Sequence, residues 1–415
     1  MVDLIMSFAG YVFLIVFGML VLQFSIIITS VLKKPKHYPE NYPSVSVIIP
    51  AYNEEKSIAK TIKNVMEAYY PSEIEIIVID DGSKDKTQDV VKKFNSVKLF
   101  EQKHSGKVAA LNFGIEIAKN DIVLTIDSDT IIERNTIKNI VKPFADKNVG
   151  AVSGQLKVSN PNGLWGTFQS IEYVYNSILR EAFSSVTKSC VISFAGALVA
   201  YRKNLLNKLG GFGTYTETED FDIAVRIEKT GYMTQFEKTA IGHTSVPTNW
   251  KGIKKQRIRW WKGGIQTISK NLTNEGKTKN IMKFVYFNFI FWSFYSLFIM
   301  PIILYQIAYW LPFNLSSLFD AGFYLFRWFS LLGPVYALYK IPEWGFSFFS
   351  IFGILSAIVY TAILSIGIHK FSEKFGFKKF LAVFFFFPYT LILNILMVAG
   401  SIKYFVSKGK GTFIN

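Results

Sequence analysis

The chain has 415 residues, enough for one large domain or for two or three smaller units. Half of the residues are hydrophobic, and the formal net charge at pH 7 is +16. A single cysteine, Cys190, excludes a framework of internal disulfides and suits a reducing compartment. No nucleic-acid-binding motif is recognisable, and the basic residues cluster beside apolar segments. The charge therefore favours an anionic membrane surface and a diphosphate substrate as partners, and no nucleic acid.

The first apolar run, Leu4–Leu32, carries no charge and is longer than the roughly 20 residues that a membrane-spanning helix needs. It lacks a small-residue cleavage site, which favours a permanent anchor over a signal peptide. Asp3 precedes the run, and Lys33, Lys34 and Lys36 follow it. The positive-inside rule then predicts an integral membrane protein with its N-terminus outside and the following residues in the cytoplasm.

Beyond Lys279, further apolar stretches cover 281–311, 319–341, 346–369 and 380–406. If all of them cross, the lysines between 370 and 379 lie outside, against the positive-inside rule. One stretch therefore lies in the interface or re-enters. The best candidate is 319–341, where Arg327 falls in mid-span and Gly333-Pro334 interrupts the helix. A tilted helix with a snorkelling Arg327 is the alternative, and the number of crossings stays open.

The middle of the chain alternates short β-rich runs with helical patterns, which predicts an α/β domain with a mainly parallel sheet covered by helices. The predicted strands are Val45–Ile49, Glu75–Ile79 and Ile122–Ile126, and the predicted helices are Glu54–Ala68 and Lys107–Lys119.

Polar or acidic clusters follow each of these strands, at the sheet edge where such folds bind ligands. They are Asn53-Glu54, Asp80-Asp81 and Asp127 with Asp129. Each alone also fits ordinary turn chemistry. Two carboxylates that bracket one residue can hold a hard divalent cation, which neutralises a diphosphate leaving group. Lys107 opens the next helix, where a lysine beside free backbone N–H groups suits phosphate, although alone it would be read as a solvated side chain.

Two later motifs complete the pattern: Thr218-Glu219-Asp220 before a helix, and Gln256-Arg257-Ile258-Arg259-Trp260-Trp261 just before the apolar stretches. Together with Asp80-Asp81-Gly82 and Asp127-Ser128-Asp129, they resemble the processive, membrane-integrated family-2 glycosyltransferases. These inverting enzymes include the cellulose, chitin, hyaluronan and poly-N-acetylglucosamine synthases. The resemblance covers about 44–275 and the placement of the flanking membrane helices.

The resemblance implies a cytoplasmic nucleotide-sugar-binding domain of the GT-A type against the bilayer. Its plan is a membrane helix at 1–32, the catalytic domain at 33–247, an amphipathic interface segment at 248–280 and a membrane region at 281–415.

The resemblance also implies roles, carried over position by position. The nucleotide-sugar site comprises Ala51, Tyr52, Asn53, Glu54, Asp80, Asp81, Lys107, Asn112, Asp127, Gln256 and Arg259. Asp129 is the better ligand for Mg²⁺ or Mn²⁺, with Asp127 beside it. Asp220 is the general base, with Glu219 and Arg259 as further catalytic residues. Trp260, Glu219 and Thr218 meet the acceptor.

A transfer that inverts the configuration at the anomeric carbon requires residues of these types. One base must take a proton from the attacking acceptor hydroxyl, which an ionised Asp220 can do. The leaving diphosphate needs no proton if a divalent cation and Arg259 absorb its charge. Trp260 offers a face for a sugar ring, or, alternatively, anchors the chain at the membrane interface.

Two segments, Leu164–Phe183 and Asn249–Lys270, combine apolar and polar residues at helical spacing and fit helices in the membrane surface. For Leu164–Phe183, a helix buried in the core of the domain is an equally good alternative.

The expected function is metal-dependent transfer of GlcNAc or Glc from a UDP-sugar to a growing polysaccharide. Coupling of this transfer to translocation of the polysaccharide stays open. The layout is nearest the poly-N-acetylglucosamine and hyaluronan synthase-like members. One alternative is a transferase that adds a single sugar to a membrane lipid, with a glycolipid product. The other is a transporter or channel with a nucleotide-sensing domain.

Overall fold

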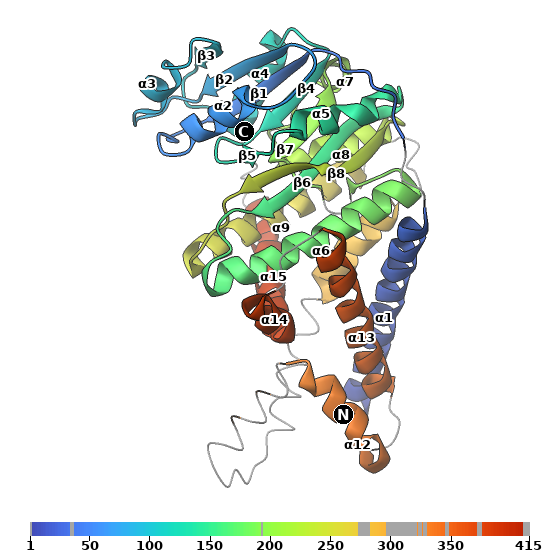
Figure 1. Ribbon diagram of the computed structural model, residues 1–415. Helices are drawn as coiled ribbons and strands as arrows, with labels where there is room; N and C mark the ends of the chain where they lie inside the picture. The colour runs from blue at the N-terminus through green and yellow to red at the C-terminus, as the bar shows by residue number, and fades with distance from the viewer. Residues whose placement is uncertain are drawn as a thin grey trace.

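An eight-stranded mixed sheet forms the centre of the upper part of the molecule in a computed structural model (Figure 1). The structure describes residues 2–33, 37–191, 194–272, 283–295, 322, 326, 330–344, 348–371 and 376–409. The strand order is β3-β2-β1-β4-β7-β6-β8-β5. The strands are β1 (Val45–Ala51), β2 (Ile74–Asp80), β3 (Val97–Glu101), β4 (Ile122–Ile126), β5 (Ile131–Ile132), β6 (Val149–Val158), β7 (Leu198–Arg202) and β8 (Met233–Thr244).

The sheet is parallel from β3 to β4 and again between β6 and β8, whereas β7 runs antiparallel to both of its neighbours. The carboxyl ends of β1, β2, β4, β6 and β8 therefore point to one edge. That edge is where such sheets place their ligands. The α/β class is confirmed, and the sheet is mixed because β7 and the short edge strand β5 run antiparallel to their neighbours.

Helices cover both faces of the sheet. Alternate residues of β1 divide between two cores: Val47 and Ile49 pack with one set of helices, and Ile48 with the other. The first set is α2 (Ile58–Met66), α3 (Thr87–Val91) and α5 (Thr136–Val141), with the 3₁₀ turn at Lys142–Ala145. The second is α4 (Lys107–Ile117), α7 (Lys203–Lys208) and α8 (Glu219–Lys229). A β-strand buried on both faces needs this near-continuous run of β-branched residues.

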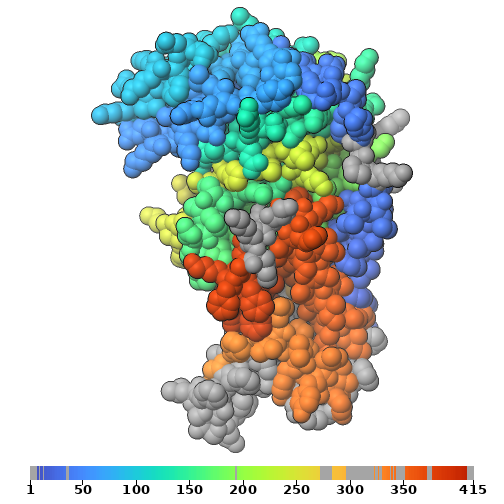
Figure 2. Space-filling view, in the orientation of Figure 1, coloured from blue at the N-terminus to red at the C-terminus, as the bar shows by residue number. Residues whose placement is uncertain are grey.

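The two long amphipathic helices lie between the sheet and the remaining helices. They are α6 (Gly163–Thr187) and α9 (Trp250–Leu272), which confirms helices over both predicted segments. One face of α6 packs against β6 and β8, and another packs against α1 (Val2–Leu32), α13 (Phe348–Lys370) and α14 (Phe377–Phe384) (Figures 1 and 2). The helix therefore has properties of both predicted alternatives, since it is largely buried and also faces the apolar helices.

Three described helices are long and apolar enough to cross a membrane: Gly10–Leu32, Ile351–Lys370 and Phe386–Lys408. The last belongs to α15 (Phe386–Gly409). They correspond to the first, fourth and fifth predicted stretches. The described parts of the other two stretches include the helical residues 283–295 and part of α12 (Leu332–Trp344). The predicted mid-span Arg327 lies outside the described residues.

The predicted elements of the catalytic domain agree with the structure in kind, and the strand Ile122–Ile126 agrees at both ends. The helix expected from Glu54 begins later, at Ile58. The preceding residues form a loop because their backbone is used elsewhere. The backbone N–H of Glu54 donates to Thr87 Oγ1 at 2.8 Å, and that of Asn53 donates to Ser83 Oγ at 2.9 Å.

A buried polar cluster joins α6, α9 and α15. Arg257 Nη2 lies 2.8 Å from Glu172 Oε2, and the Tyr389 hydroxyl donates to the same carboxylate oxygen. The two charged side chains are 7% and 14% exposed. A buried charge pair is held mainly by the penalty of separating it, so this cluster links the three helices firmly.

We predict that Glu172→Gln lowers the free energy of unfolding by about 3–5 kcal/mol, because it leaves the buried Arg257 guanidinium without a counter-charge. Thermal unfolding of the purified chain in detergent measures the effect. The control is Glu67→Gln, since Glu67 pairs with Lys63 on the surface, where both side chains are more than 60% exposed; its effect should stay within about 0.5 kcal/mol. Equal midpoints for the two variants would contradict this role.

Candidate active site

Lys107, the first residue of α4, lies among acidic side chains from two distant parts of the chain. Its Nζ is 2.6 Å from Asp127 Oδ1, at the end of β4, and 3.3 Å from Glu219 Oε1, at the start of α8. Burial opposes the charge of the amine, but the nearby carboxylates outweigh it and raise the pKa of Lys107 well above its usual range. The structure thus brings together three of the predicted site residues around one permanently charged amine.

Asp220 lies beside this group. Burial, and next the charge of Glu219, raise the pKa of the Asp220 carboxyl to about 6, while Lys107 and Arg259 oppose the rise. Its Oδ1 accepts a hydrogen bond from the Phe221 backbone N–H at 2.9 Å. A carboxylate with this pKa is ionised at neutral pH and is a stronger base than an exposed aspartate.

Gly196 makes room for Asp220. A Cβ atom added at Gly196 would lie 2.5 Å from the Asp220 Cβ and 2.8 Å from its Oδ2, closer than real Cβ contacts allow. The loop before β7 therefore approaches Asp220 because it lacks a side chain at this position. The sequence reasoning missed Gly196, and the only signal was the small-residue run Ala195-Gly196-Ala197.

The donor set at Asp127 and Asp129 fits a divalent cation. Burial, the charge of Asp127 and that of Glu54 raise the pKa of Asp129 to about 6, a sign of negative charge that no neighbour fully neutralises. Oxygen ligands of this kind suit Mg²⁺ or Mn²⁺. Within the described residues no group of three or more His, Cys, Asp or Glu side chains converges on one point, so a bound ion would need further ligands from diphosphate or water.

The ends of β1 and β2 form a neighbouring polar surface. Asp80 is fully buried; its Oδ2 accepts from the Ser83 backbone N–H and from Gln88, whereas its Oδ1 is buried without a partner in the described chain. Buried carboxylate oxygens are almost always hydrogen-bonded in complete sites, so an unpaired one is suited to a ligand N–H or O–H.

Asp81 has a structural task in the same loop. Its carboxylate accepts hydrogen bonds from the backbone N–H groups of Ser105 and Gly106, each at 2.8 Å, and its Oδ2 is 2.8 Å from His104 Nδ1. These contacts hold the turn that precedes α4. The His104 ring in turn stacks on Tyr52, with centroids 4.2 Å apart. Tyr52, one of the predicted nucleotide residues, therefore shares a surface with His104, which the sequence reasoning did not select.

The loop before α8 is fastened to α9. Thr216 Oγ1 donates to the Gly263 carbonyl at 3.0 Å, and the Glu217 backbone N–H donates to Gln266 Oε1 at 3.0 Å. A Cβ atom at Gly263 would meet Thr218 atoms at 2.7 Å, so this contact requires glycine. The helix that bears the Gln-x-x-Arg-Trp motif and the loop that bears Thr218, Glu219 and Asp220 consequently form one unit.

The three motif residues of α9 have different surroundings. Arg259 is exposed, and its Nη1 donates to the Glu217 carbonyl at 2.9 Å. The Gln256 Oε1 atom is buried and has no hydrogen-bond partner in the described chain. Trp260 lies under Arg257, whose guanidinium carbon is 4.4 Å from the ring centroid. Gln256 thus keeps an unused acceptor, while one face of Trp260 is occupied.

Asn112 does not present its amide to the site in the way the resemblance implies. Its Oδ1 accepts from the Phe212 backbone N–H at 2.8 Å, and its Nδ2 donates to the Phe212 carbonyl at 3.0 Å. Both ends of the amide are therefore used to hold the segment that leads toward Asp220. In this structure Asn112 connects α4 to that segment, and a donor-binding role would require these bonds to break.

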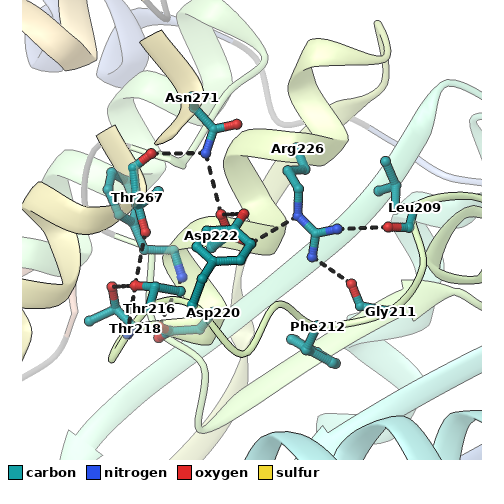
Figure 3. Close-up of polar contacts among 12 residues, drawn as sticks. Leu209, Gly211, Phe212, Thr216, Thr218, Asp220, Asp222, Arg226, Thr267 and Asn271 are labelled. Atoms are coloured by element: carbon teal, nitrogen blue, oxygen red, sulfur yellow. Dashed lines mark hydrogen bonds and ion pairs between the residues drawn. The ribbon is translucent and has the colours of Figure 1, made fainter. Parts of the chain in front are cut away.

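Asp222, which the sequence reasoning did not select, is the centre of a buried network behind Asp220 (Figure 3). It is fully buried and accepts hydrogen bonds from Arg226 Nε at 2.8 Å, Asn271 Nδ2 at 3.3 Å and the Tyr215 hydroxyl. Arg226 also donates to the carbonyls of Leu209 and Gly211. One carboxylate therefore joins α8 to the end of α9 and, through Arg226, to the loop at 209–211.

Comparison with known proteins gives a consistent result. Residues 46–210 match the family model described as "Glycosyl transferase family 2". A poly-beta-1,6-N-acetyl-D-glucosamine synthase of Staphylococcus aureus is 30% identical over 260 residues, which are 61% of this chain and 62% of that protein. The synthase of Staphylococcus epidermidis is 28% identical over 261 residues, with the same coverage of 61% and 62%. The match thus spans less than two thirds of the length of these curated relatives.

Among solved structures, a mannosyltransferase of Pyrobaculum calidifontis in complex with GDP-Man and Mn²⁺ has the same fold. Its TM-score is 0.60 at 22% identity, over 97% of this chain and 99% of that one. Residues 46–210 are therefore similar to a glycosyl transferase family 2 domain, and the chain shares its fold with the mannosyltransferase. The predicted resemblance to family-2 glycosyltransferases is confirmed, and so is the fold class.

We predict that Asp222→Asn lowers the turnover number for sugar transfer by at least about tenfold, with a smaller effect on the KM for the donor, because it loosens the support of Asp220. Loss of the charge facing the largely buried Arg226 should also destabilise the fold by about 3 kcal/mol.

Steady-state kinetics and thermal unfolding measure the two effects. Asp89→Asn, an exposed aspartate of α3, is the matched control and should change neither quantity. Unchanged turnover in Asp222→Asn would show that the network does not support the site.

Proposed function

We propose that this protein is an inverting glycosyltransferase that extends a polysaccharide at the membrane from a UDP-sugar donor. The observation that carries the proposal is the placement of Asp220, with its pKa raised to about 6, beside Lys107, Asp127 and the helix of the Gln-x-x-Arg-Trp motif. A base, cations for a diphosphate and an aromatic acceptor surface are the parts that such a transfer needs.

The donor nucleoside is assigned to the ends of β1 and β2. The unpaired Asp80 Oδ1 can accept an N–H or O–H of the nucleoside, and the exposed Tyr52–His104 stack offers an aromatic surface for a base. We assign UDP-GlcNAc as the donor, with UDP-Glc second, because the relatives are poly-N-acetylglucosamine synthases by name. The remaining predicted nucleotide residues, Asn53, Glu54 and Asp81, shape the loops around this position.

In the proposed transfer step, each of these side chains has one role. Asp220 removes the proton from the acceptor hydroxyl as its oxygen attacks the anomeric carbon from the face opposite the diphosphate. The new glycosidic C–O bond forms while the bond between the anomeric carbon and the phosphate oxygen breaks. Lys107 and Arg259 stabilise the negative charge that moves onto the diphosphate. A divalent cation held by Asp129 and Asp127 would supply further neutralisation of that diphosphate.

The acceptor is assigned to the start of α8 and the middle of α9. Thr218 and Glu219 lie directly before Asp220, and the free Gln256 Oε1 can accept a hydroxyl of a sugar. Trp260, held by Arg257, can present its ring to the sugar plane.

The membrane arrangement is part of the proposal. Lys370, at the end of α13, pairs with Glu181 of α6 at 3.0 Å, and Lys157 of β6 donates to the Phe371 carbonyl at 3.5 Å. These contacts support placing the lysines around 370–379 on the side of the catalytic domain, in the cytoplasm, as the positive-inside rule asks. The N-terminus is then on the opposite side of the membrane. The domain limits at 33–247 and 248–280 are retained as part of this proposal.

We predict that Asp220→Asn abolishes transfer from labelled UDP-GlcNAc while UDP binding, measured by calorimetry, changes less than about threefold. The pKa of Asp220 is raised by folding, so its ionised form costs stability above pH 6, and the neutral Asn should leave the unfolding midpoint unchanged or higher. Asp121→Asn, an exposed aspartate at the start of β4, is the control. Lost UDP binding in Asp220→Asn would contradict the assignment of the base.

The same pKa predicts how transfer depends on pH. Because the base must be ionised, kcat should fall about tenfold for each pH unit below about 6 and stay level above it, until another group titrates. Initial rates at saturating donor and acceptor measure this profile. A kcat that stays constant down to about pH 4.5, nearer the usual range of an aspartate, would contradict a base whose pKa is raised to about 6.

We predict that excess chelator removes transfer and that Mn²⁺ or Mg²⁺ restores it. Asp129→Asn should raise the Mn²⁺ concentration needed for half-maximal activity by at least about tenfold, because it deletes an oxygen ligand. Paramagnetic resonance of bound Mn²⁺ gives a second readout. Full activity of the wild-type protein in excess chelator would exclude a metal role for Asp127 and Asp129.

A further inference from the structure

A polar cavity of about 290 Å³ lies between the sheet and the apolar helices, outside the site described above. Its walls come from the ends of β6 and β8, from α6 and from α14. Three of its lining residues are basic in character: Lys157, His243 and Lys379. None of the described lining residues is acidic. Such a lining attracts an anion.

Uncharged polar groups complete the walls. Gln155 is only 4% exposed and lines the cavity. Ser177, which is 1% exposed, also lines the cavity. Amide and hydroxyl groups in such a wall can hydrogen-bond a ligand in the cavity.

A buried arginine adds positive charge behind this wall. Arg180 is 2% exposed, and its Nη2 donates to Ser177 Oγ at 3.3 Å, while its Nη1 is buried with no partner in the described chain. No carboxylate of the described residues forms an ion pair with it. Buried cations are normally paired, so Arg180 leaves the cavity side of α6 short of negative charge. His243 Nε2 is 3.0 Å from Glu133 Oε1, so this ring already has a carboxylate partner.

The position of α14 indicates where the anion comes from. Phe377, Phe380 and Leu381 are 73%, 49% and 37% exposed and follow one another at helical spacing, which forms one apolar face. Lys379 is on the other side of the same short helix and lines the cavity. A helix with exposed phenylalanines and a lysine turned away from them fits the membrane surface, at the depth of lipid headgroups. Figure 2 shows the red-orange C-terminal helices against α6, below the sheet.

We propose that this cavity binds the phosphate of an anionic phospholipid headgroup, with Lys157, Lys379 and Gln155 as its ligands and Arg180 as a supporting charge. The lipid chains would continue along the apolar face of α14. Headgroup binding here would hold α6 and α14 together at the surface of the bilayer. The phosphate could also come from solution, and the experiment separates these sources.

The test is thermal unfolding of the purified full chain in neutral detergent, titrated with short-chain phosphatidylglycerol, short-chain phosphatidylcholine, glycerol phosphate or inorganic phosphate. A ligand that binds only the folded state raises the unfolding midpoint with its concentration. We expect phosphatidylglycerol to raise the midpoint at concentrations where the other three do not. Lys379→Gln should weaken this apparent affinity about fivefold, the usual effect of one lysine at an anionic surface.

Lys378→Gln is the matched control, because it removes the same charge from the neighbouring exposed position of α14 and is not among the lining residues. Lys379→Arg should keep the affinity. An equal loss in Lys378→Gln and Lys379→Gln would indicate diffuse attraction and overturn the site. Equal stabilisation by inorganic or glycerol phosphate would overturn the lipid assignment, and no effect of phosphatidylglycerol on the wild type would overturn both. Donor and acceptor are absent from the assay, so its result is independent of the proposed transfer reaction.

Discussion

The close approach of four carboxylates is the constraint on which the candidate active-site edge of this protein depends. Asp127, Asp129, Glu219 and Asp220 gather around one lysine, Lys107. Burial is the largest cause that raises the pKa of two of the four carboxyls, Asp129 and Asp220, to about 6, and the charge of a neighbouring carboxylate adds to each rise. The fold keeps these charges close because two segments distant in sequence, the loop after β4 and the start of α8, meet at Lys107. An excess of negative charge at a sheet edge is what a divalent cation would relieve.

Helix α9 connects this edge of the sheet to the apolar helices. α9 contacts the acidic loop through Gly263 and Gln266 and contacts α6 and α15 through Arg257. The same helix therefore touches the proposed base and a helix long enough to cross the membrane. Since a misplacement of about 1 Å can cost a hundredfold in rate, this continuous packing gives a physical reason for joining the catalytic domain to the membrane helices.

Much of the fold could be predicted because its signals are local. The β-branched runs of β1, β2 and β4 end at polar or acidic turns; the limits of β4 were predicted at both ends, whereas β1 continues to Ala51 and β2 covers Ile74–Asp80. The antiparallel β7 could not be predicted in the same way, since its place between β4 and β6 depends on pairing between distant segments. The start of α2 at Ile58 was missed for a similar reason: the residues before it bond to the loop at 83–87.

Some residues of the candidate site could likewise be predicted from the sequence, and others could not. Residues that belong to a recognisable motif, such as Asp220 and Lys107, were selected from the sequence, and the structure brings them together. Residues that act through support were missed, because nothing in their local sequence reports it. Asp222 is separated from Asp220 by one residue but turns into the interior, toward Arg226 and Asn271. Asn112 is the opposite case: it was selected because it belongs to a motif, but in the structure its side-chain amide is hydrogen-bonded to the Phe212 backbone.

The size of the product formed by the purified full chain tests the central claim most directly. The protein would be incubated with labelled UDP-GlcNAc, Mn²⁺ and lipid, and the products separated by length. The proposal predicts a series of saccharides that grows with time to many sugars, formed by the wild-type protein and by the Asp89→Asn control. A product that stops at one sugar on a lipid, or release of free sugar alone, would contradict chain extension.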